Sequence, residues 1–467
     1  MSTDTNALTR TKDTPTPPIR LVHLGLGAFH RAHQVWYTQQ SEQDPDNPRW
    51  GYASFTGRSP RMANILGDQD GLFTLVTRSG AGDDYELITS LVEPAYAANT
   101  TRLVDLLSDP QIAVVTLTVT EAGYHLRDDG SLDVDSPDVQ ADAATLQEAV
   151  GDPFGFDRPL VTAAGKLVLG LAARRLRDAG PVAVMSCDNV ADNGRLTQAS
   201  VIGFARELNP DLAEWIESEV SFPSTSIDRI TPATDEQLAA DVEKQTGHID
   251  AAPVVTEPFA SWVIAGEFPA GRPEWERAGV EFVDDIEDFE RRKLWLLNGS
   301  HSLMAYYGQL RGHDTVAEAI GDEQVRARVE ALWDEAERHL TAPELKVPEY
   351  RASLIERFEN PRIRHNLAQI AVDGGTKQRM RAVPIMKAEL AAGRTGDAAA
   401  FSIAGWIAFL LRDGSSHEIA DTRAMELDGA RQLDDPVAAL VTTLDLGLAG
   451  DAEAVDRIRT HVAALRG

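Results

Sequence analysis

The hydrophobic pattern of the chain changes at about residue 285, and this change restricts the folds that the chain can adopt. Before that point, short apolar runs typical of strands alternate with helical segments. The strand-like runs are IRLVHLG (19–25), WGYASFTG (50–57), LFTLVTR (72–78), AVVTLTVT (113–120) and PVAVMSC (181–187). The helical segments are 99–108, 140–149, 160–178 and 194–209. Strands that alternate with helices predict a doubly wound parallel α/β sheet, and several of these runs are apolar enough to be buried on both faces.

After residue 285 helical periodicity dominates and strand-like alternation is scarce. Segments such as DFERRKLWLLNGSHSLMAYYGQL and AAFSIAGWIAFLLRDG carry it. We therefore predict an α/β domain over 19–284 and an all-helical domain over 285–467. The opening MSTDTNALTRTKDTPTPPIR is rich in Thr and Pro without an apolar core, so residues 1–18 are expected to be a disordered tail.

The net charge and the cysteine content limit the kinds of partner and the cellular compartment that we expect. The 467 residues carry a formal net charge of −29, which argues against binding to nucleic acid or to an anionic membrane surface. Cys187 is the only cysteine, so no intrachain disulfide can form and a reducing cytoplasm is expected. No apolar run approaches the roughly 20 residues that cross a bilayer. We expect a monomer or a weak homo-oligomer whose partner is a small molecule.

A glycine turn follows the first strand, in HLGLGAFHRAHQ (23–34). Gly25 and Gly27 match the first two glycines of the dinucleotide-binding fingerprint, where they permit a tight turn and a close approach of a pyrophosphate to the backbone. His30 stands where the third glycine is expected. The turn after the first strand of an alternating pattern therefore predicts a Rossmann-type cofactor site. His30 and His33 are three apart, but no accompanying HExxH or cysteine cluster points to a metal, so packing or phosphate contact is the preferred interpretation.

The end of the second strand leaves the choice of cofactor open. An NAD site usually has an acid there to hold the ribose hydroxyls, whereas this chain continues as SFTGRSPRM. Arg58 could meet the 2′-phosphate of NADP, or it could be a solvated loop residue. Both NAD and NADP therefore remain candidates.

Polar residues in two places are candidates for the chemistry. Asn189 follows the strand VMSC, where ligands collect in open α/β sheets, although turn-forming Asn is also common there. In a helix over 287–310, Glu290, Lys293, Asn298 and His301 fall within an arc of about 140°. Helix interiors disfavour Asn and Gly, so a site explains this stretch better than a solvated face does. A lysine can act as a base, and an amide can hold a carbonyl or alkoxide oxygen.

Seven motifs, in order along nearly the whole chain, resemble those of the polyol-specific long-chain dehydrogenases. This mannitol 2-dehydrogenase family also holds fructuronate reductase (mannonate oxidoreductase) and arabinitol dehydrogenase. The motifs are GLGAFHRAHQ (25–34), TVTEAGY (118–124), SCDNVADNG (186–194), FPSTSIDRITP (222–232), EPFASWVIAGEFPAGRPEWERAGVEFV (257–283), KLWLLNGSH (293–301) and IAVDGGTK (370–377). The resemblance implies an N-terminal Rossmann-type domain followed by a helical domain.

The resemblance also assigns roles. It implies Lys293 as general base, Asn189 and Asn298 as the groups that polarise the reacting oxygen, and Glu290 as a gate for water and proton exchange. The substrate contacts that we expect are Asp228, His301, Lys377 and Gln369, the last standing where mannitol enzymes can carry an arginine. The expected cofactor contacts are Gly25, Gly27, Ala28, Phe29, Arg58, Thr120 and Glu121.

We therefore expect a metal-independent, NAD(P)-dependent oxidoreductase that interconverts a sugar alcohol and its ketose, nominally D-mannitol and D-fructose. Two departures, Ala265-Gly266 and Gln378-Arg379, leave the substrate open. Fructuronate reduction to mannonate is an alternative because Lys377, Arg379 and Arg381 offer cations for a carboxylate, and arabinitol is another. A catalytically silent nucleotide-binding regulator is the alternative from a different class, but a regulator would not need the lysine and asparagine set.

Overall fold

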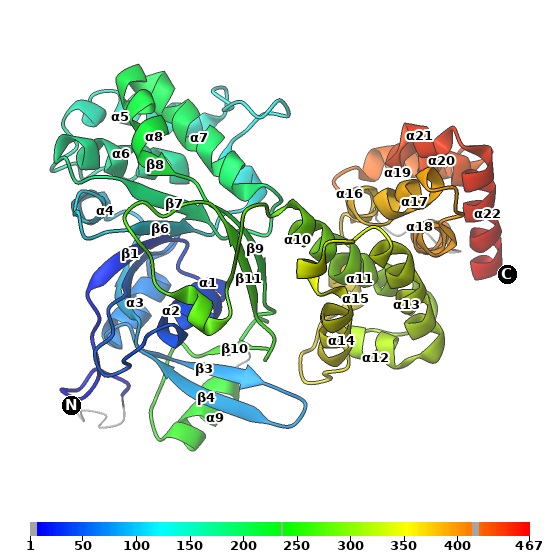
Figure 1. Cartoon of the computed structure of the whole chain (residues 1–467), viewed down its shortest axis with the longest axis horizontal. Coiled ribbons are helices and arrows are strands. Elements are labelled where there is room, and N and C mark those ends of the chain that lie inside the picture. Colours follow the sequence, from blue (N-terminus) through cyan, green and yellow to red (C-terminus); the bar gives the residue numbers. More distant parts are fainter. Residues whose placement is uncertain (1–6, 235–236, 413–419) are drawn as a thin grey trace. The chain divides into compact units, whose positions relative to one another are not determined.

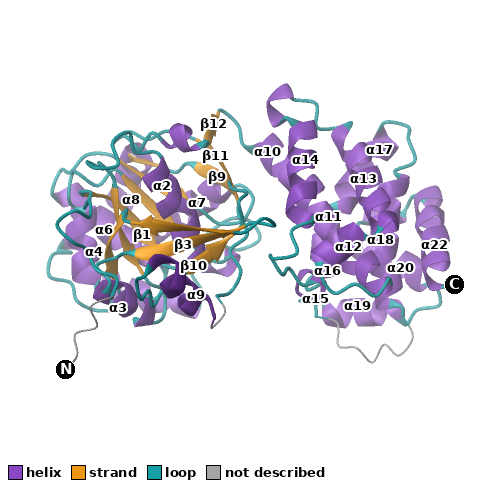
Figure 2. Ribbon diagram, turned by 90° about the horizontal axis from the view of Figure 1, so that it is seen from below, coloured by secondary structure: helices purple, strands orange, loops and turns teal. Residues whose placement is uncertain are grey.

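In the computed structural model of the chain, residues 7–234, 237–412 and 420–467 are described (Figures 1 and 2). The chain divides into two compact units, Met1–Ile286 and Glu287–Gly467. None of the helices in the described ranges combines the length and the apolar composition that crossing a membrane requires.

The centre of the first unit is a six-stranded sheet in the order β5-β2-β1-β6-β7-β8. Its strands are β1 (Ile19–Leu24), β2 (Gly51–Phe55), β5 (Leu91–Ala95), β6 (Val114–Leu117), β7 (Val182–Ser186) and β8 (Val220–Ser221). Every neighbouring pair is parallel. Numbered among themselves, the six strands follow the 3-2-1-4-5-6 order of the doubly wound fold. The predicted fold class is therefore confirmed, and the strand order reverses between β1 and β6.

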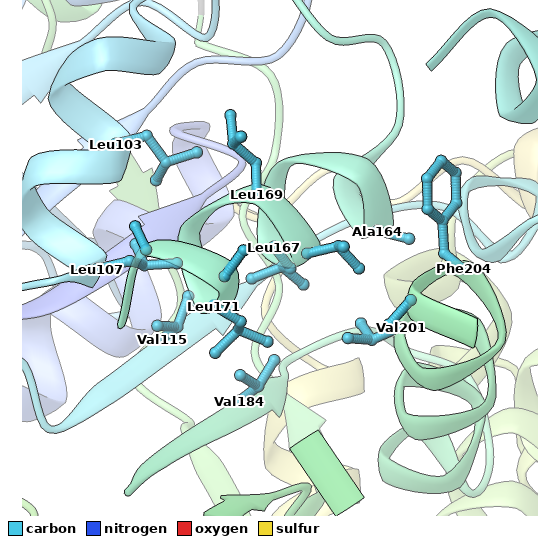
Figure 3. Close-up of a cluster of buried hydrophobic side chains, with 14 of the residues drawn as sticks. Leu103, Leu107, Val115, Ala164, Leu167, Leu169, Leu171, Val184, Val201 and Phe204 are labelled. Atoms are coloured by element: carbon cyan, nitrogen blue, oxygen red, sulfur yellow. The ribbon is translucent and has the colours of Figure 1, made fainter. Parts of the chain in front are cut away.

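Helices cover both faces of this sheet because alternate residues of each strand point to opposite sides. In β1, Val22 and Leu24 join one buried cluster and Leu21 joins the other. The first cluster, part of which is drawn in Figure 3, lies under α4 (Thr100–Leu107), α6 (Ala163–Leu176), α7 (Asn193–Leu208) and α8 (Pro210–Glu219). The second lies under α1 (Ala28–His30), α2 (Trp36–Gln40) and α3 (Arg61–Asp68). α5 (Pro137–Leu146) packs beside α6 and α7.

Two small sheets complete the first unit. One has the order β10-β3-β4, from Val254–Thr256, Phe73–Arg78 and Asp83–Ile88, and the other has the order β12-β11-β9, from Glu281–Val283, Ser261–Ala265 and Ser224–Asp228. The run LFTLVTR is a strand, as predicted, but it lies outside the doubly wound sheet. It becomes β3 because the next segment folds back on it as β4 in an antiparallel hairpin. Helix α9 (Gln237–Thr246) contacts β4.

Of residues 1–18, for which a disordered tail is predicted, 1–6 lie outside the described residues, whereas 7–18 make specific contacts with the first unit. Leu8 is buried, and its amide donates to the carbonyl of Ile249. The guanidinium of Arg10 donates to the carbonyl oxygens of Asp70 at 2.9 Å and of Leu91 at 3.0 Å. Composition alone missed this ordering because it rests on one leucine and one arginine that find partners far along the chain.

The described part of the second unit contains helices and no named strand, which confirms its predicted class (Figure 2). Its α-helices are α10 (Glu287–Arg292), α11 (Gly299–Leu303), α12 (Val316–Gly321), α13 (Glu323–Glu337), α14 (Val347–Phe358), α15 (Leu367–Ile370), α16 (Gly374–Met380), α17 (Ala382–Ala391), α18 (Asp397–Leu410), α19 (Ala424–Arg431), α20 (Pro436–Leu444), α21 (Leu446–Ala449) and α22 (Ala452–Arg466). Helix α18 is almost entirely buried and packs against α13, α17 and α22.

Candidate active site

A pocket of about 510 Å³ opens at the carboxyl ends of the parallel strands in the first unit. Its walls come from the loops that follow β1, β2, β5 and β6 and from the first turn of α6. The pocket includes the place where the strand order reverses, which is where open α/β sheets bind ligands. Gly25, Arg58 and Thr120, all predicted cofactor residues, line it.

The glycine turn has a structural requirement at Gly25. Its φ is +123°, and a Cβ there would lie 2.5 Å from the carbonyl oxygen of Thr118. Only glycine tolerates both the conformation and this close approach. At Gly27 the nearest atom to such a Cβ is 3.6 Å away, so glycine leaves bare backbone at the start of α1.

The other predicted cofactor residues lie in different surroundings. Arg58 is exposed and follows Thr56 and Gly57, so none of the first three residues after β2 is acidic. Ala28 and Phe29 are half-buried at the start of α1 and do not line the pocket. Glu121 is exposed on the short helix that follows Thr120, and it also lies outside the lining.

His30 and His33 are packed into the first unit. The His30 ring stacks on His23 with centroids 3.4 Å apart, and its two nitrogens contact Gln34 and Ser54. His33 contacts Gln34 and the carbonyl of Ser261. Both histidines therefore already have partners, which favours the packing interpretation. Among the described residues no group of three His, Cys, Asp or Glu side chains is placed to hold a metal.

Asn189, in the loop that follows β7, is exposed, whereas Asp188 before it is buried. The Asp188 carboxylate accepts hydrogen bonds from the Val119 amide at 2.6 Å, from the Ser186 hydroxyl at 2.8 Å and from the Tyr124 hydroxyl. The sequence analysis named Asn189 as a candidate and gave Asp188 no role in the chemistry. In the sequence, only its position beside Asn189 in the motif SCDNVADNG pointed to Asp188. No local pattern predicts that Val119 and Tyr124 are its hydrogen-bond partners.

Lys293 and Asn298 are the first and last residues of a π-helical segment between α10 and α11. A second π segment, Met304–Gly308, follows α11. The uniform α-helix assumed over 287–310 is therefore wrong in detail. A π turn bonds residue i to i+5 and so holds more residues than an α turn, which brings residues five apart closer around the axis. Lys293 and Asn298 are five apart and both half-buried.

His301 is the most enclosed of the predicted substrate residues, with 8% of its surface exposed. Its ring contacts Phe358 and His365, and its Nε2 has no hydrogen-bond partner among the described residues. Burial, and then the charges of nearby residues that include Arg381 and Lys377, hold the pKa of His301 well below its usual value. The imidazole is therefore neutral at physiological pH, with one nitrogen that donates and one that accepts.

The remaining predicted residues of the helical unit are unequally placed. Lys377 is half-buried and donates to the carbonyl of Ile370 at 3.0 Å, and burial lowers its pKa. Arg381 is tied to the helix of the candidate lysine, because it donates to the Asn298 carbonyl at 3.0 Å and to the Ser302 hydroxyl at 2.8 Å. Gln369 is exposed. Asp228, in the first unit, is half-buried at the end of β9.

The strand order, the glycine turn and the pocket at the point of reversal define a Rossmann-type dinucleotide-binding protein. The chain belongs to the mannitol dehydrogenase family: the model of the mannitol dehydrogenase Rossmann domain matches residues 19–277, and that of the mannitol dehydrogenase C-terminal domain matches 285–466. The resemblance inferred from the seven motifs is thereby confirmed.

Individual relatives agree with this family. D-mannonate oxidoreductase of Escherichia coli K12 is 34% identical over 92% of this chain and 88% of its own length. Mannitol 2-dehydrogenase of Aspergillus fumigatus is 37% identical over 76% of this chain and 71% of its own length. The structure of Pseudomonas fluorescens mannitol 2-dehydrogenase, a ternary complex with NAD and D-mannitol, aligns with a TM-score of 0.78 at 32% identity, covering 99% of this chain and 94% of that one. A D-sorbitol dehydrogenase aligns with a TM-score of 0.79 at 28% identity, covering 97% of each chain.

Proposed function

We propose that the protein is an NAD-dependent oxidoreductase that interconverts the CH–OH group of a sugar alcohol or aldonate with the corresponding ketone. The observation that carries the proposal is that both domain models of the mannitol dehydrogenase family match, in a chain that keeps Lys293, Asn298 and Asn189 at their motif positions. Relatives named mannitol 2-dehydrogenase and D-mannonate oxidoreductase, and a neighbour solved with NAD and D-mannitol, support this reaction class.

The first unit suits a dinucleotide. Gly25 permits the tight turn against Thr118, Gly27 leaves backbone uncovered at the start of α1, and the pocket beside this turn runs along the ends of β1, β2, β5 and β6. Gly25, Arg58 and Thr120 are the residues that we assign to the cofactor, with Gly27, Ala28, Phe29 and Glu121 as weaker assignments. A dinucleotide held there would supply the nicotinamide ring as hydride acceptor for the oxidation. We assign cofactor binding to residues 19–284 and the substrate groups, apart from Asn189 and Asp228, to 285–467.

We assign proton transfer to residues of the helical unit. We assign Lys293 as the base whose Nζ takes the hydroxyl proton during oxidation and returns it during reduction. The amides of Asn189 and Asn298 would donate to the reacting oxygen, where negative charge develops as the proton leaves. Glu290, half-buried one helical turn before Lys293, would exchange the proton with water. Asp228, His301, Lys377 and Gln369 are the proposed contacts for the remaining hydroxyls.

D-mannitol and D-fructose are the nominal substrate pair, and D-mannonate with D-fructuronate is the second candidate. The second is favoured by the similarity to D-mannonate oxidoreductase over most of both chains. Lys377 also supports it, because its ammonium donates a hydrogen bond to the neutral carbonyl of Ile370. Arg381 supports it less than the sequence suggested, since it already binds the Asn298 carbonyl and the Ser302 hydroxyl.

A substrate panel tests the proposed reaction. Purified protein would be assayed at the nicotinamide absorbance band with D-mannitol, D-arabinitol, D-sorbitol and D-mannonate in oxidation, and with D-fructose and D-fructuronate in reduction. We expect turnover with NAD and at least one of these compounds. Failure with all of them, with both NAD and NADP, while NADH still binds, would favour the catalytically silent regulator.

The same panel decides the role of Arg58. If its guanidinium holds a 2′-phosphate, Arg58→Ala should raise the KM for NADP far more than the KM for NAD. Arg61→Ala, an exposed arginine three residues further on, is the matched control. Equal effects of Arg58→Ala on both cofactors would place this residue outside the adenosine site.

The location and assembly that we propose are a cytoplasmic monomer or weak homo-oligomer. The lone cysteine, Cys187, is buried, and burial raises the pKa of its thiol. Sedimentation equilibrium at micromolar concentration would measure the state of assembly.

A further inference from the structure

The loop after β7 places two neighbouring side chains in opposite environments. Asn189, a proposed contact of the reacting oxygen, is exposed, and Asp188 has only 6% of its surface exposed. A buried carboxylate is costly unless its oxygens accept hydrogen bonds. Here they do, and two of the three donors, Val119 and Tyr124, lie on the connection after β6 and not on the loop that carries Asn189.

The Asp188 carboxylate joins two loops. Oδ1 accepts from the amide of Val119, which lies in the loop after β6, at 2.6 Å. Oδ2 accepts from the Ser186 hydroxyl at 2.8 Å and from the hydroxyl of Tyr124. Val119 lines the cofactor pocket. The carboxylate therefore ties the pocket wall to the loop that carries Asn189.

The peptide between Asp188 and Asn189 is also held from the other side. The Asn193 amide donates to the Asp188 carbonyl at 3.0 Å and to the Thr225 carbonyl at 2.8 Å, and its oxygen accepts from the Thr225 amide at 2.9 Å. Thr225 lies in β9, the strand that ends at Asp228. Side chains thus anchor the backbone of Asn189 toward both β6 and β9.

We propose that Asp188 is a positioning residue, whose carboxylate fixes Asn189 relative to the wall of the cofactor pocket. This inference rests on the proposed function, since it assumes that Asn189 contacts the reacting oxygen. An ionised carboxylate accepts from all three donors at once, whereas a protonated one must turn an O–H toward one of them. The tether is therefore strongest when Asp188 is ionised.

The charge state of Asp188 falls within a measurable range. Burial raises its pKa to about 6, against the opposing effects of Tyr124, Ser186 and Val119. The neighbouring thiol of Cys187 stays neutral because burial raises its pKa as well. The folded-state pKa lies above the ordinary carboxyl value, so ionisation of Asp188 lowers the stability of the fold as pH rises through this range. An Asp188→Asn variant should accordingly be no less heat-stable than the parent at neutral pH.

The test compares three variants by turnover and by amide hydrogen exchange. In Asp188→Ala we expect faster exchange over 118–124 and a fall in kcat on the order of 10–100-fold, with a smaller change in NADH affinity. In Asp188→Asn we expect a fall in kcat without loss of melting temperature, and the disappearance of an acid limb near pH 6 in the kcat profile. Asp192→Asn, a half-exposed acid of the same loop, is the control and should match the parent.

Each outcome decides the inference. Unchanged exchange over 118–124 in Asp188→Ala, or a kcat in Asp188→Asn equal to that of the control with the acid limb retained, would overturn it. A drop in melting temperature that accompanies every loss of kcat would reduce Asp188 to a structural role. If Asp188→Ala does not fold, the kcat and pH profile of Asp188→Asn test the inference instead. A parent protein inactive on the whole panel would instead remove the proposed function, and the exchange data would still decide the tether.

Discussion

At the scale of single residues, the assignment of Lys293 as base has a sharp consequence. Lys293→Ala should reduce oxidation by on the order of 10²–10⁴-fold, because removal of a general base typically costs that much. NADH binding, followed by fluorescence titration, should stay nearly unchanged, since the residues that we propose for the cofactor belong to the other unit.

Lys387→Ala is the matched control for this change. Lys387 is a half-exposed lysine of the same unit, paired with Asp445, and its removal should leave turnover intact. Nearly full turnover of Lys293→Ala would remove the lysine mechanism.

The stacked imidazoles of His23 and His30 make the fold sensitive to acid. Burial lowers the pKa of His23 to about 3 and that of His30 well below its usual value. The unfolded chain therefore binds protons that the folded chain does not, so stability present above about pH 6.5 is lost as pH falls toward 3. His23 alone should cost about 2 kcal/mol between pH 7 and pH 5.

Urea unfolding at several pH values measures this loss. His23→Gln should flatten the dependence of the unfolding free energy on pH between 7 and 5. His248→Gln, at an exposed histidine, should keep the parent slope. A parent whose stability does not change over this interval would contradict the buried neutral pair.

The candidate site was predictable residue by residue only where local chemistry is unusual. Gly25 could be predicted because only glycine accepts its backbone conformation and the nearby Thr118. Lys293 and Asn298 stood out because a helix interior disfavours the Asn and Gly that follow the lysine. Asp188 could not be given its partners, since Val119 and Tyr124 reach it only after the sheet order places β6 beside β7.

At the scale of elements, one arginine stabilises the connection between α6 and the sheet. Arg174 is fully buried and donates to six carbonyl oxygens, those of Leu107, Asp109, Ile112, Ala179, Gly180 and Pro181. Arg174→Met would remove all of these side-chain hydrogen bonds from the buried carbonyls, at a cost of about 3 kcal/mol or more. Urea unfolding measures this loss of unfolding free energy. The control is Arg175→Met, at the less buried neighbour, which should change the urea midpoint little. Equal effects of the two variants would contradict the stabilising role of the Arg174 hydrogen bonds.

Element types followed from periodicity, but their pairing and geometry did not. The run 72–78 was correctly read as a strand, yet its sheet depended on the hairpin with β4. The π segments Lys293–Asn298 and Met304–Gly308 have no local signature, because their extra residue per turn is accommodated by packing against other helices. For the same reason the angular positions assumed for a uniform α-helix needed correction.

At the scale of the whole molecule, the change of hydrophobic pattern near residue 285 separated an α/β unit from a helical one. The compact units divide at Ile286 and Glu287, and the two family models meet between 277 and 285. Of the residues proposed for the reaction, Asn189 and Asp228 belong to the first unit, and Lys293, Asn298, His301 and Lys377 belong to the second. The hydrophobic pattern and the sequence motifs were enough to assign each residue to its unit. They do not identify the substrate, because that depends on how individual side chains are arranged around it.

We expect a lysine, and no metal, to carry the proton in a reversible nicotinamide-dependent reaction. The most direct measurement is the rate of oxidation and of reduction as functions of pH, after prolonged treatment with EDTA, on the best substrate pair of the panel. A lysine base must be neutral to take a proton and charged to return it, so oxidation should rise with pH while reduction falls, and both should survive chelation. Loss of both activities on chelation, with recovery on addition of zinc, would contradict the claim.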